Sequence, residues 1–452
     1  MRRDSWPTSR SSYSRSRRLG VRVTSISRSN AEVVAEEVRR ASGRPPELRE
    51  RVREILESVR RGGDASLLRL AEELDGVRLA RNELVSSRQE AREAFERLSD
   101  PMRAALLALR RRIERYERGL LRRLNLRASL GGCRVWLRPA PLDSVGCYAP
   151  GGHASYPSTV LMLGVPGSVA GVERLVLATP PRRSDRDREI VLAAAYAAGF
   201  GEVVWAGGAQ AIAALAYGTE SVRPVSKILG PGNAYVQEAK RLVGGDVGTD
   251  FPAGPTELLL VVDSESPFRQ LGYELAAQAE HSPDTLVGAV ALGEEAGEKL
   301  LQEVSRVVME LPEDSPAKKS ISERGYLCIA DSLEAAALFA NRMAPEHLLI
   351  YAKIGSKSLR LFSSAGVVSY GAHASSVYLD YFAGPSHVLP TGGAARLRGG
   401  LTVLDYVRLV PYVRPLRGSA GEALRRVGPL VEAEGLPIHL EALRRAAGYG
   451  VG

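Results

Sequence analysis

The chain has 452 residues, enough for two or three domains with buried cores, and its 44% hydrophobic and 25% charged residues are typical of a soluble globular protein. It contains no run of about 18 apolar residues, which excludes a transmembrane helix. The net charge of +9 comes largely from arginines early in the chain, but no aromatic-interleaved basic groove or zinc-finger spacing accompanies them, so we expect neither nucleic acid nor membrane as a partner.

The first residues and the cysteines bear on where the protein works. Residues 1–24 are rich in Arg and Ser without an apolar period, which predicts a disordered arm. This arm is similar to the polar half of a targeting peptide but lacks the apolar core of a secretory signal. Cys133, Cys147 and Cys328 are scattered and odd in number, which fits a reducing compartment without disulfides. We therefore expect a cytoplasmic protein.

Apolar residues recur at helical spacing through residues 25–130. Val52, Ile55 and Val59 are one such set, and residues 102–124 carry leucines among many arginines. The pattern predicts an amphipathic helical layer that packs on the core or on a neighbouring subunit.

Short apolar strands alternate with helical stretches further along, which predicts an α/β fold of βαβ units with parallel sheets. We expect two doubly wound, incomplete Rossmann-like domains, at 131–245 and 246–390. The predicted strands are 175–180, 202–208, 225–230, 257–262, 285–290, 326–329 and 367–369. The predicted helices are 188–198, 209–217, 234–243, 268–281, 294–310 and 333–342.

The C-terminal tail, residues 391–452, is expected to be mostly helical. One helix is predicted over 401–410, ended by Pro411, and another stretch over 420–447, broken at residues 435–437. Because the tail is too short for its own core, we expect it to dock on another domain or another subunit.

A candidate metal site begins at the end of the helix 268–281. Gln278 and His281 are three residues apart, so their side chains share one face of its last turn. For this pair alone, an exposed histidine at a helix end is the favoured alternative. However, His281, His347, His387 and His439 each lie near an acid or amide in separate late segments. Gln278, His281, Asp380 and His439 together form a mixed nitrogen and oxygen set that suits zinc.

Glu346 and His347 form a candidate acid–base pair. Pro345 follows a helix and predicts an irregular loop that presents the two side chains together. An adjacent carboxylate and imidazole can act as general bases. The alternative is an ordinary pair of loop residues in solvent.

Three glycine-rich turns, at residues 148–152, 206–210 and 230–233, lie next to predicted strand or helix ends. The last two precede helix N-termini, where backbone N–H groups favour phosphate. None is a G-x-G-x-x-G fingerprint, so the spacing predicts a phosphate-containing ligand without identifying it. Tight turns that need glycine explain the same residues.

These segments together resemble the histidinol dehydrogenase family, which catalyses the last two steps of histidine biosynthesis. The resemblance covers roughly residues 48–447. Motifs such as Gly230-Pro231-Gly232-Asn233 and Gln278-Ala279-Glu280-His281 carry it. The matching blocks are 148–162, 207–218, 230–236, 253–257, 278–281, 344–347, 387–393 and 434–439.

The resemblance implies roles for individual residues of this chain. It implies zinc ligands at Gln278, His281, Asp380 and His439, with His439 donated by the partner in a homodimer. It implies that Glu346 and His347 are the acid–base pair and that Tyr148, Gln210 and Asn233 contact NAD. The implied substrate-binding positions are Thr256, Gln278, His281, His347, Asp380, His387, Glu434 and His439.

The implied activity is a zinc-dependent, NAD-linked oxidation of L-histidinol through L-histidinal to L-histidine. Two positions depart from the family pattern: Thr256 stands where serine is usual, and Leu379 where glycine usually precedes the zinc aspartate. Two other classes compete with this reading. One is a metal-dependent hydrolase without a nucleotide cofactor, and the other is a non-catalytic nucleic-acid or scaffold protein.

Overall fold

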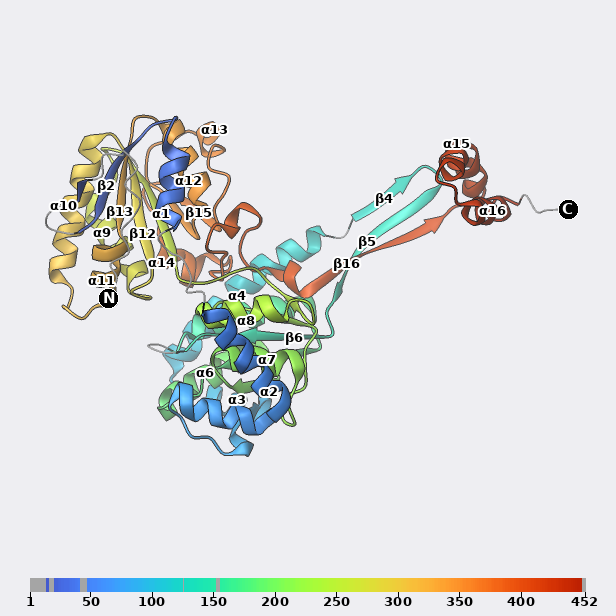
Figure 1. The fold of residues 1–452 in the computed structure, drawn as a ribbon, viewed down its shortest axis with the longest axis horizontal. Helices are drawn as coiled ribbons and strands as arrows, with labels where there is room; N and C mark the ends of the chain where they lie inside the picture. Colours follow the sequence, from blue (N-terminus) through green and yellow to red (C-terminus); the bar gives the residue numbers. More distant parts are fainter. Residues whose placement is uncertain (1–13, 16–19, 41–46, 125, 152–154, 449–452) are drawn as a thin grey trace.

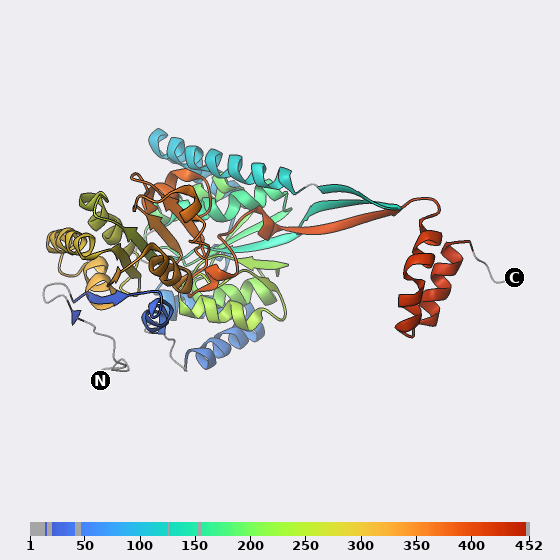
Figure 2. The ribbon, with the colours of Figure 1, turned by 90° about the horizontal axis from the view of Figure 1, so that it is seen from above.

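The structure, a computed structural model, describes residues 14–15, 20–40, 47–124, 126–151 and 155–448 (Figure 1). It contains two parallel-sheet domains and a long β-arm that carries a pair of helices at its far end (Figures 1 and 2). The predicted fold class of two doubly wound α/β domains with added helices is confirmed. None of the helices in the described ranges combines the length and apolarity that crossing a membrane requires.

The first domain is built on a sheet with the strand order β10-β9-β6-β7-β8-β3, parallel except for β3. Its strands are β3 (Val85–Ser87), β6 (Ser144–Tyr148), β7 (Arg174–Thr179), β8 (Glu202–Trp205), β9 (Lys227–Leu229) and β10 (Gly248–Thr249). Its helices are α2 (Leu48–Leu70), α3 (Arg88–Arg97), α4 (Asp100–Arg123), α5 (Pro157–Ala170), α6 (Asp185–Ala198), α7 (Gly208–Tyr217) and α8 (Ala234–Val243). The strands and helices predicted here from periodicity are confirmed, whereas β6 was not predicted.

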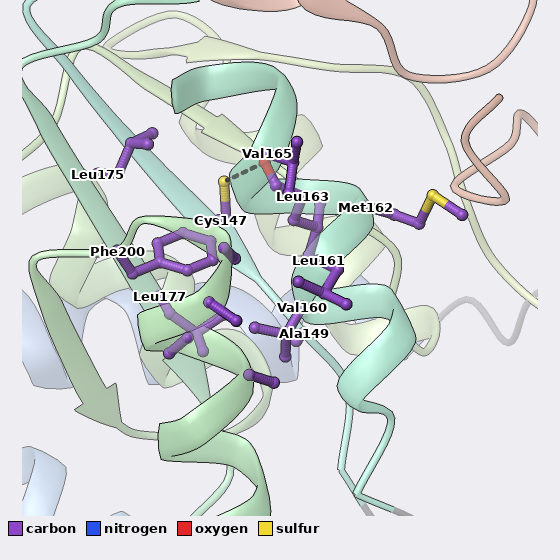
Figure 3. Packing of buried hydrophobic residues seen from close by; sticks show 14 of the residues in the cluster. Cys147, Ala149, Val160, Leu161, Met162, Leu163, Val165, Leu175, Leu177 and Phe200 are labelled. Carbon is purple, nitrogen blue, oxygen red and sulfur yellow. Dashed lines mark hydrogen bonds between the residues drawn. The ribbon is translucent and has the colours of Figure 1, made fainter. Parts of the chain in front are cut away.

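The core of this domain lies between β6, β7 and helix α5 (Figure 3). Buried Cys147 donates from Sγ to the Leu163 carbonyl at 3.8 Å. Gly164 allows close packing, because a Cβ at that position would lie 2.5 Å from a ring carbon of Phe200. Cys133, Cys147 and Cys328 are all free thiols.

The second domain has the strand order β1-β2-β13-β12-β11-β14-β15, parallel except for β1. Its strands are β1 (Ser14–Arg15), β2 (Arg22–Ile26), β11 (Glu257–Val262), β12 (Leu286–Leu292), β13 (Tyr326–Ala330), β14 (His347–Ile350) and β15 (Val367–Tyr370). Its helices include α1 (Ala31–Arg40), α9 (Phe268–Ala279), α10 (Glu294–Glu310), α11 (Pro316–Arg324), α12 (Leu333–Met343), α13 (Ser356–Leu359) and α14 (Ser376–Tyr378). The π-helical turn η3 (Leu379–Ala383) follows α14.

Residues 25–130 are largely helical, as predicted, but their helices do not form a single layer. Strand β2 pairs with β13, and α1 packs on α12, so the N-terminal segment belongs to the second domain. Helices α2, α3 and α4 instead pack on helices of the first domain. Amphipathic helices of one segment can cover two sheets, and periodicity does not distinguish the two cases.

Two predicted domain limits also change. Residues 248–249 belong to the first sheet, beyond the predicted limit at 245. The predicted disordered arm, 1–24, contains β1 and most of β2; residues 1–13 and 16–19 lie outside the described part.

The β-arm consists of β4 (Leu126–Leu130), β5 (Cys133–Pro141) and β16 (Val407–Pro415), all antiparallel. The predicted helix over 401–410 is therefore wrong: a short 3-10 turn, η5 (Val403–Tyr406), leads into a strand. Within the arm β16 pairs only with β5, so Pro411 sits on an edge strand, where its missing N–H is tolerated.

The tail after the arm forms α15 (Ser419–Ala433) and α16 (Pro437–Ala446), broken where the sequence predicted. The two helices pack on each other at the tip of the arm, away from both domains (Figures 1 and 2). Within α15 and α16, all of whose residues are described, only Gly428 and Leu440 are buried. In the single chain the tail therefore does not dock on either domain.

A buried ion pair holds the turn after β9. Lys240 on α8 contacts the Asp250 carboxylate and donates to the Gly230 carbonyl at 2.8 Å. Asp250 in turn accepts the Gly230 N–H at 2.7 Å. The two charged side chains are 4% and 0% exposed. Removing one partner would leave an uncompensated buried charge.

We expect Lys240→Met to lower the free energy of unfolding by about 3 to 5 kcal/mol, because Asp250 would lose its counter-charge inside the core. Lys299→Met is the matched control, since the Lys299–Glu295 pair lies on an exposed helix face and should cost less than about 1 kcal/mol. Denaturant unfolding measures both. Equal costs in the two variants would contradict the role of the buried pair.

Candidate active site

The predicted acid–base pair lies at the amino end of strand β14. Glu346 immediately precedes β14, and His347 is its first residue, paired with Leu258 on β11. The expected irregular loop is short: it comprises residues 344–346 and presents Glu346, whereas His347 already belongs to the strand. The side chains of Glu346 and His347 are buried, so the alternative of a solvent-exposed pair is excluded.

The hydrogen bonds of His347 set which ring nitrogen can act as a base. Its Nε2 lies 3.2 Å from Asp380 Oδ1, and because a carboxylate only accepts, Nε2 donates. In the neutral ring this leaves Nδ1 as the acceptor, and Nδ1 is buried without a partner. Burial alone would lower the pKa of His347, but the hydrogen bond and charge of Asp380 outweigh it and raise that pKa.

Asp380 joins three parts of the second domain. It sits on η3, and its carboxylate accepts both from His347 and, at 3.2 Å, from Gln278 Nε2 on α9. Burial would raise the pKa of Asp380, but the hydrogen bond and charge of His347 keep it below its usual value. Leu379, the position where the family pattern has glycine, has φ −59° and ψ −48°, so the backbone there is helical and needs no glycine.

Gln278 supplies an unused ligand atom. The side chain is 2% exposed, its Nε2 is held by Asp380, and its Oε1 is buried without a hydrogen-bond partner. Burying an amide oxygen without a hydrogen-bond partner is unfavourable. The Gln278 Oε1 atom is therefore better suited to coordinate a divalent cation than to contact apolar groups. His281 lies just past the end of α9 and is exposed to solvent.

The fold of a single chain does not bring all four predicted metal ligands into one site. Gln278 and Asp380 touch, and His281 follows Gln278 on the same turn, its N–H lying 3.3 Å from the Gln278 carbonyl. His439 and Glu434 are exposed on the tail helices at the tip of the β-arm (Figure 1). In the described residues no group of three or more His, Cys, Asp or Glu side chains is arranged to hold a metal ion.

His387 connects the site to the first domain. Its Nδ1 donates to the Asp380 carbonyl at 3.0 Å, so in the neutral ring Nε2 accepts from Thr159 on α5, also at 3.0 Å. Burial lowers the pKa of His387, which favours this neutral form. The sequence did not single out Thr159.

Glu257 and Arg39 form a second layer behind Glu346, and neither was predicted as a site residue. The backbone N–H of Glu257 donates to Glu346 Oε2 at 3.0 Å, and the Glu257 carboxylate accepts the Gly392 N–H at 2.8 Å. The charge of Arg39 acts on that carboxylate from α1. Burial, the largest cause, raises the pKa of Glu346 to about 8.

The predicted nucleotide residues line one cavity of about 890 Å³. It opens at the carboxyl ends of β6, β7, β8 and β9, beside the point where strand order reverses between β6 and β9. The glycine-rich turns contribute Tyr148, Gly151, Gly208, Gln210 and Asn233; Gly152 lies outside the described residues. The charged residues of its lining are Arg51, Asp75, Arg182, Arg183 and Asp187.

Some polar side chains of this cavity are held by hydrogen bonds, whereas others have buried polar atoms without a hydrogen-bond partner. Tyr148 Oη accepts the Gly208 N–H at 3.1 Å, and Asn233 caps α8 by accepting from two backbone N–H groups. Gln210 Oε1 and Arg182 Nε are buried without partners. Guanidinium groups beside the N-termini of α7 and α8 could bind a phosphate-containing ligand. Gln210 Oε1 and Arg182 Nε could form further hydrogen bonds with the same ligand.

Comparison with known proteins identifies the family. A family model described as histidinol dehydrogenase matches residues 38–446. The chain belongs to the histidinol dehydrogenase family. The histidinol dehydrogenase of Thermus thermophilus is 43% identical over 412 residues, which cover 91% of this chain and 98% of that protein. That of Gloeobacter violaceus is 38% identical over 93% of this chain and 95% of its own.

A solved structure agrees with the sequence relatives. The crystal structure of histidinol dehydrogenase from Elizabethkingia anophelis aligns with a TM-score of 0.82 and 29% identity, covering 89% of this chain and 92% of that one. As a histidinol dehydrogenase family member, the chain is an oxidoreductase of histidine biosynthesis. The family assignment therefore favours the dehydrogenase over the hydrolase and scaffold alternatives.

The raised pKa of Glu346 predicts how stability of this family member depends on pH. The folded chain keeps the proton up to about pH 8, whereas an unfolded glutamate releases it near its ordinary pKa of 4.5. Protonation therefore contributes stability below about pH 4.5, and this contribution is lost as the pH rises to about 8. Glu346→Gln cannot release a proton and serves as the reference.

We expect the wild-type free energy of unfolding, relative to Glu346→Gln, to fall by more than about 1 kcal/mol between about pH 5 and pH 8. Denaturant titrations of both metal-free proteins at several pH values measure this difference. A difference that stays constant or rises with pH would contradict the raised pKa.

Proposed function

We propose that this family member oxidises L-histidinol to L-histidine in two successive NAD-linked steps, with L-histidinal as the intermediate and one zinc ion at each site. The observation that carries the proposal is the orientation of His347. Asp380 fixes its Nε2–H, so a buried, unpartnered Nδ1 lies 3.9 Å from Glu346 Oε2. A base and a carboxylate held side by side suit an alcohol oxidation followed by hydration of an aldehyde.

The residues present fit the two groups that the reaction requires. Gln278, His281 and Asp380 would hold zinc, with His439 as a fourth ligand, and the unpartnered Gln278 Oε1 supports this assignment. Zinc, when bound, would anchor the imidazole and amine end of the substrate. Tyr148, Gln210 and Asn233 would hold NAD in the cavity at the carboxyl ends of the first sheet. NAD, when bound, accepts a hydride in each oxidation.

The chain's own residues then divide the proton transfers. His347 Nδ1 takes the proton from the alcohol in the first oxidation, while Asp380 stabilises the resulting imidazolium. In its carboxylate form, which the folded chain reaches as the pH rises through about 8, Glu346 removes a proton from the water that adds to the aldehyde before the second oxidation. Thr256, His387 and Glu434 would contact the substrate, and Thr256 keeps the hydroxyl of the usual serine. Burial of Glu346 and His347 limits loss of the aldehyde to water.

We expect Glu346→Gln to lower kcat/KM for supplied L-histidinal by about 100-fold or more, with a smaller loss for L-histidinol oxidised only to the aldehyde. His347→Asn should show the opposite preference, because the alcohol proton is lost in the first step. NADH absorbance with each substrate separately measures the rates. Equal losses for both substrates in both variants would remove this division of roles, and no NADH from zinc-replete wild type would overturn the proposed function.

The proposed site also requires two chains. His439 is exposed on α16 at the end of the arm, while Gln278 and Asp380 lie in the second domain (Figure 1). The arm and tail expose apolar side chains that a second copy would cover: Leu126, Leu130, Tyr412, Val413, Leu430 and Ile438. We therefore propose a homodimer in which the tail of each chain completes the site of the other.

We expect His347→Asn and His439→Ala, each inactive alone, to recover about a quarter of wild-type activity when they are unfolded and refolded together. Half of the randomly assembled dimers are mixed, and each mixed dimer has one intact and one doubly damaged site. NADH production after co-refolding measures the recovery, and each variant refolded alone is the control. Mixed dimers that remain inactive would show that His439 serves its own chain.

A further inference from the structure

One side of the nucleotide cavity is lined by two acceptor groups, the Asp75 carboxylate and the Gln210 amide oxygen. Asp75 is the last residue of a π-helical turn, η1 (Ala71–Asp75), that continues α2 into the cavity wall. Its Oδ2 accepts from Gln210 Nε2 at 3.2 Å. Its Oδ1 lies so close to Gly207 that a Cβ there would approach it to 2.6 Å. The glycine before α7 therefore allows a carboxylate to sit against the start of that helix.

Gln210 extends this acceptor surface. Only 2% of the residue is exposed, and its Nε2 is engaged by Asp75. Its Oε1 is therefore the atom left over, and it is buried without a partner. A ligand group that satisfies Asp75 and Gln210 together must donate hydrogen bonds, as adjacent hydroxyl groups do.

Other parts of the same cavity present donors. Arg182 donates from Nη2 to Thr179 Oγ1 at 2.9 Å, and its Nε is buried without a partner. Arg51 also lines the cavity. Arg183 lies beside Asp75, and its Nη2 donates to the Asp75 backbone carbonyl at 3.4 Å. Guanidinium groups suit phosphate oxygens, so the cavity offers cationic donors for a diphosphate and acceptors for sugar hydroxyls.

We propose that Asp75 binds the hydroxyl pair of the adenosine ribose and thereby selects NAD against its 2′-phosphorylated form. The inference rests on the proposed NAD-linked function. A 2′-phosphate would replace a donor by an acceptor and would place negative charge against the Asp75 carboxylate. Asp75 would thus be a specificity-determining residue contributed by the N-terminal helices.

The competing explanation is that Asp75 only orients Gln210. Asp75→Asn separates the two, because the asparagine carbonyl can still accept from Gln210 Nε2 while the charge is lost. Glu72→Gln is the matched control, since Glu72 lies on the same turn, is exposed and does not line the cavity. Asp75→Ser is a second variant that also removes the charge.

The experiment measures dissociation constants of NAD and NADP by calorimetry with the full-length protein and no substrate. We expect wild type and Glu72→Gln to favour NAD strongly, and Asp75→Asn and Asp75→Ser to reduce the NAD-over-NADP ratio by about tenfold or more. If the folded Asp75 variants bind NAD and keep the wild-type ratio of NAD to NADP affinity, the selectivity role of Asp75 is overturned but the NAD assignment stands. Wild-type protein that binds neither nucleotide would overturn both this inference and the NAD assignment on which it rests.

Discussion

The Asp380 carboxylate is the interaction on which the site depends. It accepts hydrogen bonds from His347 on β14 and Gln278 on α9, so one side chain orients a base and a candidate metal ligand at once. The backbone carbonyl of Asp380 accepts from His387, whose ring contacts Thr159 of the first domain. Loss of this carboxylate would release His347 and Gln278 together, because both side chains are buried and hydrogen-bond to it.

Much of the fold was predictable because buried parallel strands are continuous apolar runs between amphipathic helices. Residues 257–262 and 285–290 are examples, and both are strands of the second sheet. The errors came where tertiary pairing decides the structure. Residues 407–415 contain prolines and tyrosine in an apolar segment, and pairing with β5 makes them a strand rather than a helix. Likewise, Arg22–Ile26 gains its strand structure from β13, far along the chain.

Candidate site residues such as Glu346 and His347 could be selected from the sequence through motifs, but their arrangement in space could not be predicted. In open parallel sheets ligands usually bind outside the carboxyl ends of strands, where the cavity lined by Tyr148, Gln210 and Asn233 lies. Glu346 and His347 instead lie at the amino end of strand β14, a placement that no local pattern indicates. Asp75 and Arg39 belong to no motif, and Glu257 ends the matching block 253–257 without an implied role, so only the folded structure shows their contacts. Asp75 and Arg39 are an acid and an arginine near helix ends, a signal that is too common to select.

The pairing of β2 with β13 has a consequence for how the chain is made. Strand β2 ends at Ile26, whereas its partner β13 begins at Tyr326, with the whole first domain between them. At the usual 5 to 20 residues per second, about 300 residues take roughly 15 to 60 s to synthesise. During that interval the first domain can complete its own sheet while β2 lacks its partner β13. The N-terminal segment is therefore exposed to chaperones and proteases for most of translation, and its final insertion is a late event in the life of each new chain.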